Sequence, residues 1–287
     1  MTPEIIAFLA AICFALFAVY GWLGLRSSTP LTATVVSLAA RTITLAAGVA
    51  LGGGIPDYES DAMRIFVLLG VLQSTISLLT FLGLQKIGTS RSQALRNSYP
   101  LWSALVAIVV VGENARATVL AGTLLVVAGV ISISWKPESA PPSYRAWHVL
   151  YSLAAGLLAG VAFPLRRHGL TITNEPMFFS FVIALVSLAG SIPYVLWTRS
   201  DQGLIWNRKG VTCFALSGFF EALGALFTLV ALTNARVVIV SPIVATTPLF
   251  SLIISIIFFR GKEQISGLTV AGTIAVVAGT IAIALGK

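Results

Sequence analysis

Glu221 lies inside a long apolar stretch, SGFFEALGALFTL, where a charged side chain is unexpected. An ionisable group at the centre of a membrane-spanning helix costs about 2.5–3.5 kcal/mol on insertion scales, so such a residue needs a reason to be there. The carboxylate either binds an ammonium group of a ligand or accepts a proton that is coupled to the ligand's passage. Alternatively, it is a structural carboxylate that a neighbouring Arg or Ser holds in a buried position. The residue types leave both interpretations open.

Arg41, in LAARTITL, is the second charged residue expected well inside an apolar segment. Its guanidinium group either binds a carboxylate of a ligand or ties helices together, through Glu221 or through helix-end carbonyl groups. Arg91 and Arg96 lie near the start of another apolar segment, so we expect both side chains to extend to the lipid headgroups. Because phosphate recognition needs several paired donors, a single central arginine argues against a phosphorylated ligand.

Other polar and aromatic residues lie in corresponding apolar segments. Gln73, in GVLQSTISLL, matches Glu221 at an offset of 148 residues, which indicates that both face a common centre. Aromatic side chains in such segments face lipid, pack against other helices or line an apolar pocket. Pro100 and Pro248 each remove a backbone hydrogen-bond donor and are predicted hinges. The predicted ligand-binding residues are Phe14, Gln73, Ser77, Tyr99, Trp102, Phe163 and Glu221.

The composition places these residues in a membrane protein, because hydrophobic residues make up 57% of the chain and charged residues only 10%. Soluble domains contain about a quarter charged residues, and apolar stretches of about 18 residues or more predict transmembrane helices. We therefore predict an all-α polytopic membrane protein with ten transmembrane helices. The predicted spans are Ile5–Leu25, Leu31–Leu51, Met63–Leu84, Gln93–Val111, Ala117–Trp135, His148–Leu170, Pro176–Thr198, Val211–Leu232, Val237–Phe259 and Ile265–Leu285.

Several other classes of protein are excluded. The net charge of +8 comes from Lys and Arg near the predicted helix ends, which is typical of lipid headgroup contacts and not of a nucleic-acid surface. The sequence contains no HExxH, GxSxG or phosphate-binding loop motif, and its two histidines, His148 and His168, lie near predicted loops. We therefore predict no enzymatic activity, no cofactor and no metal site.

The chain contains an internal repeat. AGTLLVVAGVISIS, which begins at Ala121, matches AGTIAVVAGTIAIA, which begins at Ala271, at nine of fourteen positions. Glu113 and Glu263 precede the two copies at the same spacing, and further upstream a Pro lies at the same place in SYPLWSALVAIVVV and TTPLFSLIISIIFF. Apolar helices resemble one another by composition, but shared Pro, acidic and Gly positions in one order indicate a duplication.

The duplication divides the chain into a first five-helix repeat over residues 1–135, a Pro-rich linker over 136–147 and a second five-helix repeat over 148–287. Because five is odd, the second repeat enters the membrane from the opposite side, so the two repeats are inverted. Inverted repeats are typical of secondary transporters, which hold substrate near the membrane midplane between the two halves. The sequence therefore predicts a carrier that works by alternating access to a central cavity.

These features resemble the EamA-type branch of the drug/metabolite transporter superfamily over essentially the whole chain. The resemblance rests on the acidic residue and Gly-rich last helix of each repeat, on Arg41 in the second span and on the aromatic–Pro step NSYPLW in the fourth. NSYPLW is also similar to the YddG-like amino-acid exporter branch. The resemblance implies export of amino acids and related metabolites across the cell inner membrane.

Two functions stay open. Amino-acid export is favoured, because a zwitterion needs an acid, a set of donors and an apolar pocket. The alternative is a carrier for other solutes, such as sugars, nucleotide-linked metabolites or drugs. Since two complete repeats can enclose a pathway, we predict a monomer whose partners are a small-molecule substrate and the lipid bilayer. The loop charges, eleven basic residues against six on the side of the termini, favour termini outside, whereas the family resemblance implies termini in the cytoplasm.

Overall fold

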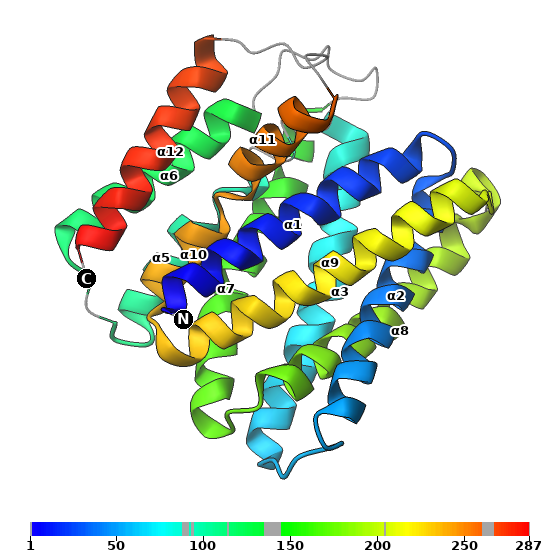
Figure 1. The fold of residues 1–287 in the computed structure, drawn as a ribbon, viewed down its shortest axis with the longest axis horizontal. Helices are drawn as coiled ribbons and strands as arrows, with labels where there is room; N and C mark the ends of the chain where they lie inside the picture. The colour runs from blue at the N-terminus through cyan, green and yellow to red at the C-terminus, as the bar shows by residue number, and fades with distance from the viewer. Residues whose placement is uncertain are drawn as a thin grey trace.

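The computed structural model is helical and describes residues 2–87, 92, 95–113, 115–134, 145–203, 205–259 and 267–286. These residues form no β-strand. Glu263 and most of the predicted linker 136–147 lie outside the described ranges. Figure 1 shows the arrangement of the elements. They are α1 (Pro3–Leu25), α2 (Pro30–Leu51), α3 (Ser60–Ile87), α5 (Tyr99–Val109), α6 (Ala117–Ser134), the short 3₁₀-helix η1 (Ala146–His148), α7 (Val149–Ile172), α8 (Pro176–Gln202), α9 (Arg208–Asn234), α10 (Val237–Val244), α11 (Thr247–Phe259) and α12 (Gly267–Leu285).

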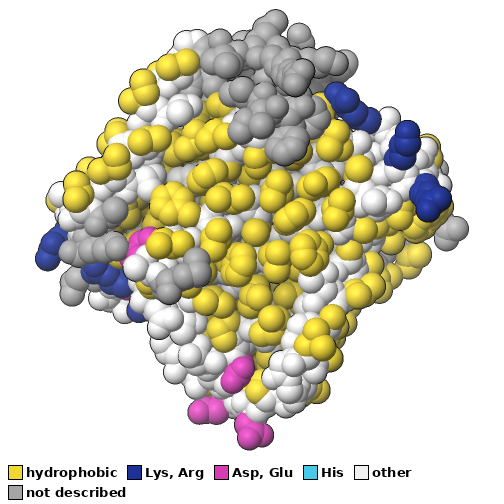
Figure 2. All heavy atoms as spheres, in the orientation of Figure 1, with side chains coloured by type: hydrophobic (Ala, Val, Ile, Leu, Met, Phe, Trp, Pro, Cys, Tyr) yellow, Lys and Arg dark blue, Asp and Glu magenta, His cyan; other side chains and the backbone are white. Residues whose placement is uncertain are grey.

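Within the part of the chain that the structure describes, seven helical segments are long and apolar enough to cross a membrane. The chain is therefore a multi-pass membrane protein. Three shorter apolar helices, Tyr99–Val109, Ala117–Ile133 and Val270–Ile283, lie inside the three other predicted spans, so ten crossings stay a prediction. Figure 2 shows apolar side chains over the middle of the visible face and charged ones toward its edges, as a surface in contact with lipid requires.

The fourth and ninth predicted spans are interrupted at matching positions. Asn97 and Ser98 form a turn directly before α5, and Ala245 and Thr246 form a turn between α10 and α11. The two turns are 148 residues apart, the same offset that relates the repeated sequences. A proline occupies the second position of the helix that follows each turn, where its missing N–H costs little. The predicted hinges, Pro100 and Pro248, thus lie in the first turn after each break.

At each break, a side-chain hydroxyl of the turn donates a hydrogen bond to a backbone carbonyl three residues earlier. Ser98 Oγ donates to Leu95 O at 2.7 Å, and Thr246 Oγ1 donates to Ile243 O at 2.7 Å. These two hydrogen bonds also correspond at the offset of 148 residues. The backbone N–H groups of Ser98 and Thr246 donate to the same two carbonyls, so each hydroxyl adds a second hydrogen bond there. Side-chain hydroxyls that satisfy backbone groups are one way in which an interrupted helix is tolerated within a membrane.

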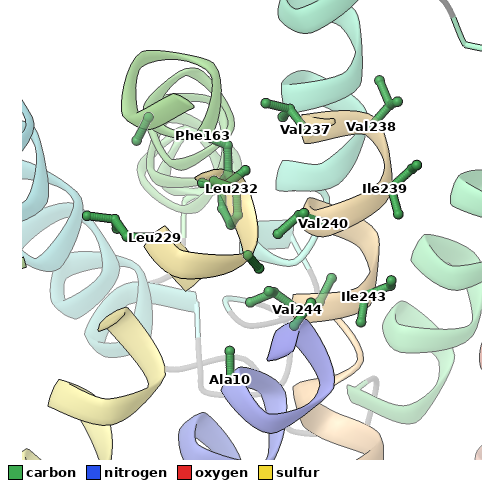
Figure 3. Packing of buried hydrophobic residues seen from close by; sticks show 14 of the residues in the cluster. Ala10, Phe163, Leu229, Leu232, Val237, Val238, Ile239, Val240, Ile243 and Val244 are labelled. Atoms are coloured by element: carbon green, nitrogen blue, oxygen red, sulfur yellow. The ribbon is translucent and has the colours of Figure 1, made fainter. Parts of the chain in front are cut away.

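α10 is a short helix with no exposed face. All eight of its residues are buried, and the following turn, Ala245 and Thr246, is 2% and 1% exposed. Figure 3 shows the α10 side chains among Phe163 of α7, Leu232 of α9 and Ala10 of α1, which belong to the same hydrophobic cluster. A helix that is apolar on all sides belongs in the interior, so the second break lies deep in the bundle.

The two Gly-rich repeats pack directly against each other as α6 and α12, which lie side by side at one end of the molecule (Figure 1). Gly122 lies against the carbonyl of Gly279, and Gly129 lies against the carbonyl of Gly272. A Cβ atom built on any of these four glycines would come within 2.5–2.7 Å of its partner's carbonyl oxygen. Only glycine permits this approach, which is how small residues bring membrane helices together.

The other long helices pack in corresponding pairs. α1 packs along α9 and α7 packs along α3, while α2 contacts both α8 and α9 and α8 contacts α3. Every one of these pairs joins a helix from the first predicted repeat to a helix from the second. Among the described helices, few contacts join two helices of the same predicted repeat. The core therefore forms mainly between the two predicted repeats.

We expect Gly129→Leu to destabilise the protein by about 1–3 kcal/mol, because the added side chain cannot fit against the backbone of Gly272. Thermal unfolding in detergent micelles measures the effect. Ala128→Leu is the matched control, since Ala128 is the neighbouring residue on α6 and is exposed. Equal unfolding temperatures for the two variants would show that the close contact does not limit stability.

Candidate functional site

The structure pairs the two charged residues that the sequence singled out. Arg41 Nη1 of α2 donates to Glu221 Oε1 of α9 at 2.9 Å, and the side chains are only 4% and 15% exposed. The pair joins α2 to α9, which pack against each other. Since one carboxylate oxygen is engaged by Arg41, Glu221 has a structural partner whether or not it also contacts a ligand.

Arg166 of α7 brings a second predicted residue into the same region. Its Nη2 donates to Gln73 Oε1 of α3 at 3.3 Å, and its guanidinium carbon lies 5.4 Å from the centre of the Phe163 ring. A guanidinium over an aromatic face is stabilised by the ring quadrupole. α7 also contacts α9, the helix that carries Glu221, which connects this contact to the Arg41–Glu221 pair.

The aromatic part of the site joins three helices. Tyr99 of α5 stacks on Phe163 of α7 with ring centres 5.4 Å apart and an interplanar angle of 11°. Tyr99 Oη donates to the carbonyl of Ser241 in α10 at 3.4 Å, and Ser103 Oγ of α5 is 2.5 Å from Ser241 Oγ. The stacked pair and these hydrogen bonds tie the helix that follows one break to the helix that precedes the other.

Arg96 is a further member of the site, and its predicted extension to the lipid headgroups is wrong, whereas Arg91 lies outside the described residues. The carbonyl of Arg96 lies against Gly156 of α7, and Arg96 directly precedes the break at Asn97 and Ser98. Its Nε atom is buried. The break explains the difference, because the turn ends a helical segment inside the bundle, where Asn97 is buried.

Sequence reasoning therefore missed Arg96 and Arg166. Arg166 falls inside the predicted span His148–Leu170, and Arg96 falls inside Gln93–Val111. A basic residue inside a predicted transmembrane span is itself a sign that the side chain lies within the bundle, and this sign was available for both arginines. The expectation of a single central arginine is wrong as well. The site contains three guanidinium groups and one carboxylate, so its formal charge is three minus one, or +2.

The remaining predicted ligand-binding residues lie at the edge of this group or outside it. Trp102 packs against Gly160 of α7, and its Nε1 is buried. Ser77 Oγ donates to Gln73 O within its own helix at 2.9 Å. Phe14 packs against Gly224 of α9. The structure thus brings together Arg41, Gln73, Tyr99, Phe163 and Glu221, while Phe14 and Ser77 flank them.

Glu113, the acidic residue that precedes the first Gly-rich repeat, holds a separate contact between the halves. Its carboxylate accepts hydrogen bonds from Val237 N at 3.0 Å and Val238 N at 3.2 Å, at the start of α10. Arg167 Nε lies 3.3 Å from Glu113 Oε1, and Arg167 Nη1 donates to Ala235 O. A carboxylate at a helix N-terminus satisfies free N–H groups and complements the helix dipole.

No metal site emerges from the described residues, since they contain no group of three or more His, Cys, Asp or Glu side chains placed to hold an ion. Cys13 and Cys213 are free thiols.

Comparison with known proteins gives a family and a fold. The model of the family described as "EamA-like transporter family" matches residues 1–135 and 146–285. Among solved structures, 29 chains match. One, described only as "Crystal structure of protein", has a TM-score of 0.80 and 16% sequence identity, and the match covers 99% of this chain and 96% of that chain. At that identity the likeness shows the fold alone. Curated protein sequences give no match.

Glu221→Gln is expected to lower the free energy of unfolding by about 3–5 kcal/mol, because Arg41 would become a buried charge without its carboxylate. The double variant R41Q/E221Q should be more stable than E221Q, since it removes both charges. Chemical unfolding in micelles measures both. R64Q is the control: it breaks the exposed Arg64–Asp61 pair, also 2.9 Å long, and should cost under about 1 kcal/mol. An E221Q variant as stable as R64Q would contradict the expectation.

Glu113→Gln is expected to cost about 1–2 kcal/mol, because an amide is a poorer partner for the N–H groups of α10 and for Arg167. Thermal unfolding of the purified protein measures the change. D57N serves as the matched control, since Asp57 is an exposed carboxylate in the loop before α3. If E113Q unfolds at the same temperature as D57N, the contact with α10 contributes nothing measurable.

Proposed function

Because the chain belongs to the EamA-like transporter family, and is thus a membrane transporter of small solutes, we propose that it exports amino acids or related small metabolites across the cell inner membrane. The observation that carries the proposal is the buried polar site at the meeting point of α2, α3, α5, α7 and α9. Polar and ionisable groups within a membrane bundle are costly and mark solute pathways. The site also lies beside the break before α5.

The proposed architecture is two inverted five-helix repeats, residues 1–135 and 148–287, joined by the linker 136–147. The reciprocal glycine contacts support it. Gly122 corresponds to Gly272 and Gly129 to Gly279 at the offset of 150 residues, while the contacts run from Gly122 to Gly279 and from Gly129 to Gly272. Contacts that exchange partners in this way are the mark of a two-fold relation between equivalent surfaces.

Alternating access would follow from this architecture, because equivalent halves have two equivalent ways to pack. The broken fourth and ninth spans support such a mechanism, since interrupted helices in corresponding positions are a feature of transporter binding sites. In the proposal, Pro100 and Pro248 let the segments on either side of each break change their relative angle. No ATP-binding motif is present in the sequence, so transport would use a gradient or proceed by facilitated diffusion.

The proposed substrate-binding residues divide by chemistry. Arg41, Gln73 and Glu221 supply hydrogen bonds and charge, and the Arg41–Glu221 pair also holds α2 to α9. Tyr99, Trp102 and Phe163 supply an apolar wall, as an amino-acid side chain requires. Phe14 and Ser77 complete the wall on the α1 and α3 sides. A monomer suffices, because both halves of the site belong to one chain.

The second candidate is a carrier for other solutes, such as sugars, nucleotide-linked metabolites or drugs. The excess of arginine over acidic residues favours anionic members of that class over neutral sugars and cationic drugs, because a buried cationic site attracts anions and repels cations. The two candidates differ in substrate and share the fold, the site and the mechanism.

Purified protein in liposomes should show saturable uptake of labelled amino acids, tested with aspartate, leucine, phenylalanine and lysine. Glu221→Gln, reconstituted only after size-exclusion chromatography shows a single folded species, should lose at least about tenfold in uptake rate, since one transition-state interaction of about 1.4 kcal/mol gives that factor. D57N and protein-free vesicles are the controls. Uptake of every amino acid at the protein-free rate would sink amino-acid export and favour the second candidate.

A further inference from the structure

We propose that the carried solute is an organic anion whose carboxylate or phosphate group binds between Arg96 and Arg166. The inference rests on the proposed carrier function and specifies its substrate class. It concerns two residues that lie outside the predicted ligand-binding set and that the structure brings to the centre. Three features of the site support it: two arginines have no carboxylate partner, several buried N–H groups have no acceptor, and aromatic side chains lie next to them.

The charge balance leaves two arginines without a carboxylate. Arg41 is paired with Glu221 at 2.9 Å. Among the described residues, no carboxylate lies within ion-pair distance of Arg96 or Arg166. Both residues are partly buried. Because a partly desolvated charge without a partner is unfavourable, an anion bound between the two arginines would remove an existing electrostatic cost.

The hydrogen-bond inventory points to an acceptor. Within the described chain, Arg41 Nε, Arg96 Nε, Arg166 Nε and Trp102 Nε1 are buried N–H donors without a partner. More than nine-tenths of buried polar groups in native proteins are paired, and each exception calls for an explanation. These four can only donate, and they come from α2, α5, α7 and the residue before the first break. The other two buried groups without a partner are the hydroxyls of Ser180 and Ser187 on α8, which can donate or accept. A carboxylate or phosphate supplies only acceptors, which is the complement of such a set.

Neighbouring contacts hold Arg166 in place for this role. Gln73 Oε1 accepts from one terminal nitrogen, Nη2, and the Phe163 ring supports the guanidinium face. The Nε edge is left without a protein partner. A guanidinium group fixed in this way presents a preorganised edge, and planar arginine edges bind carboxylate and phosphate oxygens in pairs.

The aromatic residues indicate that the anion has an organic body. Tyr99 and Phe163 stack next to the two arginines, and Trp102 follows Tyr99 by one turn of α5. A neutral zwitterion would leave the site at +2, whereas an acidic amino acid, a dicarboxylate or a phosphate monoester would lower that charge. A phosphorylated ligand is compatible with this site, because the site contains three arginines and not one.

Ligand-induced stabilisation of the full-length protein in detergent tests the inference without requiring transport. The probes are aspartate, succinate and glycerol 3-phosphate as anions, leucine as a zwitterion and lysine as a cation, all at constant ionic strength. We expect the anions to raise the unfolding temperature and leucine and lysine not to, because a ligand that binds only the folded state stabilises it. The succinate and phosphate arms separate carboxylate from phosphate recognition.

Four variants make the test specific. R96Q and R166Q should weaken anion binding by about ten- to a hundredfold, the factor for losing a charged hydrogen-bonding partner. R166K keeps the charge without the planar edge and should bind with intermediate affinity. R64Q removes an exposed arginine and should bind as the wild type does. If R96Q or R166Q fails to fold, R166K and competition between anions on the wild type still decide the question.

The outcomes separate this inference from the proposed function. Stabilisation by leucine alone, by no anion, or equally in the wild type, R96Q and R166Q overturns the anion site. Saturable uptake of leucine but of no anion would likewise overturn it while leaving the carrier function intact. Anion binding that R96Q and R166Q abolish, together with no uptake of any probe into liposomes, would uphold the site and overturn the proposed transport.

Discussion

Lipid offers no hydrogen-bond partners, and this constraint governs every polar group inside the bundle. Arg41 Nη1 meets it through the carboxylate of Glu221, and the carbonyl groups of Leu95 and Ile243 at the two helix breaks meet it through Ser98 and Thr246. Glu113 does the same for the first N–H groups of α10. Since each of these groups finds its partner within the protein, irregular backbone and charged side chains can coexist with an apolar exterior. The unpartnered donors near Arg96 and Arg166 are notable against this background.

Packing between the halves supplies the rigid frame around that polar centre. α6 and α12 touch through glycine backbones, while the long helices pack in pairs that cross from one half to the other. α10 fills the space between α1, α7 and α9 mainly with Val and Ile side chains, while its Ser241 hydroxyl pairs with Ser103 of α5. As a result, the residues that carry charge sit where five helices meet, and a shift of one half relative to the other must change the distances among them.

Hydropathy, the repeated sequence and the acidic residue of each repeat were sufficient for predicting a multi-pass helical protein of this family, because these signals are local. They also placed Glu221 and Arg41 inside the bundle. The breaks were only partly predictable. Pro100 and Pro248 indicated kinks, but each turn also depends on a hydroxyl group that donates to a backbone carbonyl, and hydropathy does not show such a contact. Arg96 and Arg166 were missed because the direction of a side chain depends on how its helix is rotated and on its neighbours, and hydropathy records neither. The exchange of partners among the four glycines depends in the same way on tertiary packing.

The charged residues of the site do not follow the internal repeat of the sequence. At the offset of 148 residues, Arg96 corresponds to Val244, which is buried in α10, and Glu221 corresponds to Gln73. In an assembly of two identical chains, any charge added to one half would appear twice, and two buried copies would double its desolvation cost. A single chain that contains both halves can place each charge once. The reciprocal glycine contacts between α6 and α12 are therefore compatible with a centre whose charges are not repeated.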